Sequence, residues 1–115
     1  MPSPAVKLLY IASGANPHCR DYLDAALTSA VFGLHVAVLF LGEGVAQLTA
    51  SAPGATEGLT NPVDELLQYG VTDIYVQQQG LVDTVTSRPS DSRITELSNL
   101  DISRLIARHD QVFNF

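Results

Sequence analysis

The sequence has little cysteine, little positive charge and no long hydrophobic run. One cysteine in 115 residues excludes an internal disulfide framework and favours a reducing cytoplasm. Six Lys and Arg against 12 Asp and Glu give a formal net charge of -6, which argues against a nonspecific grip on nucleic acid or anionic lipid. No apolar run approaches the roughly 20 residues of a membrane helix, and the N-terminus lacks the features of a signal peptide. We expect a soluble, cytoplasmic protein that contacts neither nucleic acid nor membrane directly.

Several common site chemistries are missing as well. His18, His35 and His109 lie far apart, and none has a cysteine or second histidine at metal-ligand spacing. The loop after the first apolar run has one glycine and a proline, whereas a dinucleotide fold needs G-x-G-x-x-G there. A phosphate loop ending in Gly-Lys-Ser/Thr and the acidic residues of a receiver domain are absent too. We therefore expect neither a metal nor a cofactor.

Apolar runs are plentiful, since 46% of the residues are hydrophobic. A chain of this size can bury one core without disulfides or metals, so we expect a single domain over residues 1–115. Three nearly continuous apolar runs predict strands buried on both faces, which are typical of a parallel sheet covered by helices. These are residues 6–12, 35–41 and 73–77. Two shorter, more mixed segments, 93–97 and 111–115, predict further strands.

Helices are predicted between these strands. The first ends at Gly33 in the left-handed cap position. Its apolar stripe consists of Leu23, Ala26, Leu27, Ala30 and Val31. The second begins with Asn61 as N-cap and Pro62 as its first helical residue, and it ends at Gly70. Its apolar residues are Val63, Leu66 and Leu67.

Two more helices complete the alternation of strand and helix. One begins near Gly80 or Leu81 and ends before Pro89. The other is expected to be capped by Asp101 and to bury Ile102, Leu105 and Ile106. Because parallel crossovers are short and right-handed, this alternation predicts a three-layer α/β/α sandwich with a mainly parallel sheet of about five strands.

Ligands of such sheets bind beyond the carboxyl ends of the strands. The candidate pocket or interface residues are therefore Ser13, Gly14, His18, Gly42, Glu43, Gly44, Gln77, Gln78 and Gln79. The Glu43 carboxylate would oppose an anion in the Gly-Glu-Gly segment, which favours a structural turn; a pocket wall or a subunit contact is the alternative. The three glutamines can form hydrogen bonds but cannot act as acid, base or nucleophile.

Cys19 is the one possible sulfur nucleophile. It is expected at the start of the first helix, where the helix dipole and the neighbouring His18 and Arg20 favour a thiolate. Asp21 and the overall negative charge oppose that, and inert packing is the commoner role of a lone cysteine. A thiol sulfur carrier that uses Cys19 is one alternative function, and a small-ligand module at Ser13 and the adjoining strand ends is another.

Three motifs in order carry a family resemblance. They are an apolar strand that runs into Gly-x-Gly-Val-x-Gln-Leu at 42–48, a helix leading into YGVTDIYV at 69–76, and a closing strand that ends in Asn-Phe. From Leu8 to Phe115 the chain resembles the DsrE/DsrF-like family and, within it, the TusC (DsrF) subunits of sulfur-relay complexes. The resemblance is weakest at residues 49–60.

This resemblance implies a sulfurtransferase heterohexamer with two copies each of TusB-like, TusC-like and TusD-like subunits. Such complexes take persulfide sulfur from a cysteine desulfurase relay and pass it, through a further sulfur-carrier protein, to 2-thiolation of the tRNA wobble uridine. DsrF-type relatives serve dissimilatory sulfur oxidation instead. In the family the sulfur-accepting cysteine follows the third strand, where this chain has residues 77–80 without a thiol. The chain is therefore expected to be a noncatalytic subunit with no activity alone.

Overall fold

The structure is a computed structural model that describes residues 6–14, 21–45, 62–78 and 94–115. Five strands form one sheet in the order β4-β3-β2-β1-β5, and every neighbouring pair runs parallel. The strands are β1 (Lys7–Ala12), β2 (His35–Phe40), β3 (Asp73–Gln77), β4 (Thr95–Leu97) and β5 (Gln111–Asn114). The described helices are α1 (Asp21–Val31), α3 (Pro62–Gln68), α5 (Asn99–Ala107) and the short 3-10 helix η1 (Gly42–Val45).

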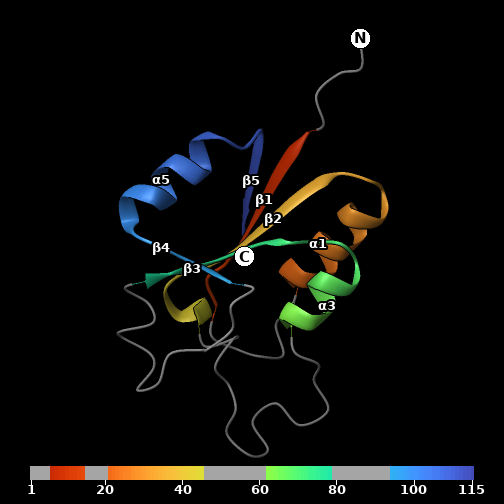
Figure 1. Ribbon diagram of the computed structural model, residues 1–115, viewed down its shortest axis with the longest axis horizontal. Coiled ribbons are helices and arrows are strands. Elements are labelled where there is room, and N and C mark those ends of the chain that lie inside the picture. The colour runs from red at the N-terminus through yellow and green to blue at the C-terminus, as the bar shows by residue number, and fades with distance from the viewer. Residues whose placement is uncertain (1–5, 15–20, 46–61, 79–93) are drawn as a thin grey trace, which may run out of the picture.

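Helices cover both faces of this sheet. α1 and α3 lie on one side, and α5 lies on the other (Figure 1). The chain thus has the predicted three-layer arrangement, and the sheet is parallel throughout. β2 is the central strand, with two strands on either side of it.

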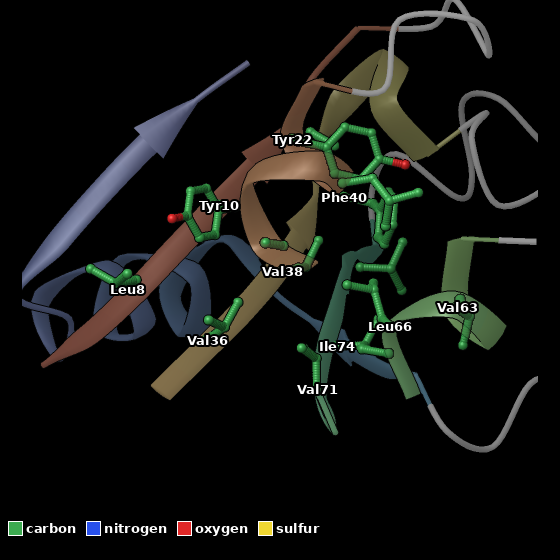
Figure 2. Packing of buried hydrophobic residues seen from close by; sticks show 14 residues of the cluster. Leu8, Tyr10, Tyr22, Val36, Val38, Phe40, Val63, Leu66, Val71 and Ile74 are labelled. Atoms are coloured by element: carbon green, nitrogen blue, oxygen red, sulfur yellow. The ribbon is translucent and has the colours of Figure 1, made fainter. Parts of the chain in front are cut away.

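Two cores lie on the two faces of the sheet. The larger joins alternate residues of β1, β2 and β3 to α1 and α3 (Figure 2). The smaller joins Leu9, Ile11, Ala37 and Leu39 to Ile102 and Leu105 of α5. Successive side chains of a strand point to opposite faces, so a strand covered on both sides must be apolar throughout. This explains the unbroken apolar runs of β1 and β2, whose residues after the first are all buried.

The prediction for β3 needs a correction. Only Ile74 and Val76 are buried, whereas the alternate residues Asp73, Tyr75 and Gln77 are partly exposed. The first set faces the larger core and Tyr75 packs against the smaller one. The described helix on that face is α5, whose buried residues pack mainly on β1 and β2. β3 is therefore fully buried on one face alone.

The predicted helix ends at Gly33 and Gly70 are confirmed, since both have positive φ, of 79° and 85°. Two apolar residues were wrongly expected in the core. Val31 is 67% exposed in the last turn of α1, and Ile106 is 38% exposed in the last turn of α5. Each lies at the end of its helix, where the apolar stripe that faces the sheet also ends.

The predicted cap of α5 is also wrong. Ser98 is the N-cap, and its Oγ accepts the Asp101 backbone N–H at 3.3 Å. The same hydroxyl donates to the Asp101 carboxylate at 3.1 Å. Asp101 is thus the third helical residue, and the segment S-x-x-D is a variant of the capping box. The helix begins three positions earlier than a cap at Asp101 requires.

Other expectations lie outside the described residues, namely the cap at Asn61, the helix between 80 and 89 and the strand residue Arg93. The described strands are slightly shorter than predicted, because Val6, Leu41, Ile94 and Phe115 lie outside them. Among the described helices, none is long and apolar enough to cross a membrane.

Candidate functional site at the carboxyl edge of the sheet

The carboxyl ends of the strands bring several predicted residues together. Ser13 follows β1, Gly42 follows β2 after one residue, and Gln77 ends β3. Because the strands are parallel, these ends meet at one edge of the sheet. Side-chain hydrogen bonds join five segments there in two sets, one made by Ser13 and the other by Gln77.

Ser13 joins the end of β1 to the end of β5. Its hydroxyl has one proton, which is shared between two acceptors, Asn114 Oδ1 at 2.9 Å and the Phe115 carbonyl oxygen at 2.7 Å. Its backbone N–H donates to the same Phe115 oxygen at 2.9 Å. The hydroxyl is therefore directed at the closing strand, which fixes the position of that strand against β1.

Gln77 joins the ends of β2, β3 and β4. Its Oε1 accepts the Gly42 backbone N–H at 2.9 Å, and its Nε2 donates to Asn99 Oδ1 at 3.0 Å. Asn99 is the first residue of α5, so one amide ties the turn after β2 to the helix after β4. Gln78 is exposed next to it. The neutral amide suits this role, because it supplies a donor and an acceptor at once.

The Gly-Glu-Gly segment is η1, and its two glycines have different roles. Gly42 has φ of 56°, in the left-handed region that favours glycine. A Cβ on Gly44 would overlap the carbonyl group of Ala12. Leu41 N–H also donates to that Ala12 oxygen at 2.9 Å, so the chain passes very close to the end of β1. These are the positive φ and the close approach expected of a structural turn, and the Glu43 side chain lies exposed between them.

A cavity of about 160 Å³ lies beside Ser13 at this edge. Its described lining consists of Ala12, Gly14, Asp21, Tyr22 and Phe115. The walls are mainly apolar, and Asp21 at the start of α1 adds one carboxylate. This lining suits an apolar group better than an anion.

Among the described residues of this edge, the polar groups that form hydrogen bonds join one part of the chain to another. The Ser13 hydroxyl and the Gln77 amide are directed at other parts of the protein. The described Lys7, His35 and His109 lie near the opposite edge, where the strands begin. No group of three or more potential metal ligands occurs within the described residues.

Sequence reasoning found part of this arrangement. Ser13, Gly14, Gly42, Gly44 and Gln77 do lie at the same edge of the sheet. Their partners Asn99 and Asn114 were not singled out. An asparagine beside the end of each outer strand was the available signal. The candidates His18, Cys19 and Gln79 lie outside the described residues.

Comparison with known proteins agrees with the fold and the motifs. The model of the DsrE/DsrF-like family matches residues 6–115. This chain belongs to the DsrE/DsrF-like family. The family expected from the three sequence motifs is thereby confirmed.

Individual relatives refine that placement. The chain is 31% identical over 105 residues to the protein named "Protein TusC homolog" from Pseudomonas aeruginosa, covering 85% of this chain and 86% of the relative. The ychN protein of Escherichia coli has a similar fold, with a TM-score of 0.72 and 14% identity over 96% of this chain and 99% of the other. A conserved protein from Bacteroides thetaiotaomicron gives a TM-score of 0.70 and 18% identity over 95% and 94%. At such identities the two structures support the fold alone.

Proposed function

We propose that this protein is a TusC-type, noncatalytic subunit of a heterohexameric sulfurtransferase complex that relays persulfide sulfur. The observation that carries the proposal is the 31% identity to a TusC homolog over 85% of the chain. The complex would act in the cytoplasm in 2-thiolation of the tRNA wobble uridine. Its other members would be TusB-like and TusD-like subunits, two copies each, with a further sulfur carrier downstream. The chain would enter it as a single domain over residues 1–115.

The residues at the carboxyl edge agree with a noncatalytic role. Residues 77–80, which begin with the last residue of β3, include no cysteine, although the family resemblance puts the accepting thiol there. Gln77 at the start of that segment binds the turn after β2 and the start of α5. It therefore contributes to the shape of this edge and has no group that could carry sulfur. The net charge of -6 suits contacts with proteins better than contacts with tRNA.

Coexpression with TusB-like and TusD-like proteins from the same genome tests the assembly. We expect one complex whose intact mass in native mass spectrometry corresponds to two copies of each subunit. A chain that stays alone and binds neither partner would overturn the proposal. The same experiment with DsrE-like and DsrH-like proteins distinguishes a sulfur-oxidation complex from a tRNA-thiolation complex.

Sulfur loading tests the noncatalytic role. The purified complex is incubated with a cysteine desulfurase relay and cysteine, and each subunit is then weighed intact. We expect added sulfur mass on the TusD-like subunit and none on this chain. A complex carrying Cys19→Ser is the matched control and should load to the same extent. Added mass on this chain that disappears in the Cys19→Ser variant would instead establish a sulfur carrier.

A further inference from the structure

A second cavity lies at the opposite edge of the sheet, where the strands begin. Its volume is about 170 Å³. It is lined by Lys7, His35, Asp73 and Tyr75 from β1, β2 and β3, by Leu105 of α5, and by Arg108 and His109, which follow α5. Figure 1 shows this end of α5 beside the start of β5. The cavity is thus separate from the candidate site at the carboxyl edge.

Basic side chains are concentrated around this cavity. The described part of the chain has five, which are Lys7, His35, Arg104, Arg108 and His109. All except Arg104 line the cavity. In a protein with a formal charge of -6, most of the described basic side chains thus gather at one cavity, which the Asp73 carboxylate also lines.

The nearby carboxylates are engaged with other groups. Asp73 lies 2.9 Å from His35 Nε2, and the Asp110 carboxylate accepts the Lys7 backbone N–H at 2.8 Å. Within the described part of the chain, the Lys7 ammonium and the Arg108 guanidinium form no ion pair. Two cationic side chains therefore face the cavity without an anionic partner from the described residues.

Tyr75 adds a hydrogen-bond donor to the same cavity. Burial is the main cause that raises its pKa above the ordinary value of 10.0, and the Asp73 carboxylate raises it further while Arg108 opposes the shift. The hydroxyl consequently stays protonated at neutral pH. Since it lines the cavity beside Arg108, it can donate to an acceptor held there.

We propose that this cavity binds a tetrahedral oxyanion of the phosphate class between the Lys7 ammonium and the Arg108 guanidinium. The planar guanidinium can donate two parallel hydrogen bonds to such an anion, and the ammonium supplies a compact second charge. A cavity of about 150 Å³ holds benzene, so a phosphate ion, which is smaller, fits a cavity of 170 Å³. This site is independent of the sulfur relay proposed above.

Titration of the isotopically labelled full chain with inorganic phosphate tests the site by NMR. We expect the chemical shifts of the backbone amides near residues 7, 75 and 108 to change and to saturate. Sulfate should give the same result. Acetate and sodium chloride at equal ionic strength should give none that saturate. A phosphate monoester in a further arm distinguishes a site for free phosphate from one that accepts an esterified phosphoryl group. Shifts that do not saturate, or that occur equally with chloride, would overturn the proposal.

Charge-removing variants give the second measurement. Arg108→Gln and Lys7→Gln should each raise the Kd for phosphate about tenfold, the effect of losing one charge-assisted hydrogen bond. Arg104→Gln is the matched control, because Arg104 lies in the last turn of α5, four residues before Arg108, does not line the cavity and is paired with Asp101 at 3.9 Å. It should leave the Kd unchanged. Equal affinity in all three variants and the parent chain would refute the assignment, even if the parent binds phosphate.

Discussion

Replacement of Gly44 by alanine tests the close approach between η1 and the end of β1. The new Cβ would overlap the Ala12 carbonyl group, a backbone group that cannot move without disturbing the strand. Overpacking of this kind costs roughly 1–3 kcal/mol. The hydrogen bond from Leu41 N–H to the same carbonyl oxygen, at 2.9 Å, would be strained or lost, which adds about 1 kcal/mol. We expect Gly44→Ala to lower the free energy of unfolding by about 2–4 kcal/mol.

Two neighbouring glycines supply matched controls. A Cβ on Gly14 would meet no atom within 4 Å, and Gly14 does not have positive φ. Gly14→Ala should therefore change stability by less than about 0.5 kcal/mol. A Cβ on Gly42 also has open space, but φ is 56° there, so Gly42→Ala should cost about 1–2 kcal/mol from backbone strain alone.

Urea unfolding of the four proteins, followed by circular dichroism, measures these differences. Linear extrapolation gives the free energy of unfolding, and equal m-values would show that all four unfold from comparable native states. The expected order of loss is Gly44→Ala, then Gly42→Ala, then Gly14→Ala. The reasoning is refuted if Gly44→Ala is as stable as Gly14→Ala, because the close approach would then not exist.

Three further predictions concern single side chains. Gln77→Ala should lower the free energy of unfolding by about 1–3 kcal/mol in urea, because the Gly42 N–H loses its acceptor. Ser98→Ala should lower it by about 1 kcal/mol through loss of the helix cap, whereas Ser103→Ala in the same helix should have a smaller effect. The raised pKa of Tyr75 contributes stability that is fully present below its ordinary value of 10.0 and is lost as the pH rises through the folded-state pKa. Above about pH 10, the free energy of unfolding should therefore fall less with rising pH in Tyr75→Phe than in the parent chain.

Each of these has an outcome that contradicts it. If Gln77→Ala is as stable as the parent chain, the hydrogen bond between Gly42 and Gln77 does not contribute to stability. Equal losses for Ser98→Ala and Ser103→Ala would argue against a specific cap. If the free energy of unfolding depends on alkaline pH in the same way in the parent chain and in Tyr75→Phe, the Tyr75 hydroxyl ionises in the folded protein as it does in the unfolded chain.

The predicted elements were most accurate where the hydrophobic pattern agreed with residues that end a helix, such as glycine. β1 and β2 appear as unbroken apolar runs, and Gly33 and Gly70 mark two helix ends. Apart from β3, which is fully buried on one face alone, the errors lie at element ends. Val31 continues the apolar period of α1 yet is 67% exposed, because periodicity does not show where a helix leaves the sheet. The cap of α5 was misplaced because both Ser98 and Asp101 are good cap residues, and only the backbone geometry distinguishes them.

The candidate site could be predicted only in outline. The rule that loops follow parallel strands at one edge placed Ser13, Gly42 and Gln77 together. It did not give their partners, because hydrogen bonds such as Gln77 to Asn99 depend on strand order and register. The basic cavity at the opposite edge was missed for the same reason. Lys7 and Arg108 are about a hundred positions apart, and the pairing of β1 with β5 brings them to one cavity.

The sequence by itself determined the class of fold, the family and the absence of a thiol after β3. These follow from local hydrophobic patterns, glycine positions and residue identities, which need no knowledge of distant contacts. Tertiary structure decided which glycine of the Gly-Glu-Gly turn has no room for a side chain. It also decided which polar groups join the strand ends and where the basic side chains gather. Each of these depends on the order of strands in the sheet, and strand order is set by long-range packing that no local pattern specifies.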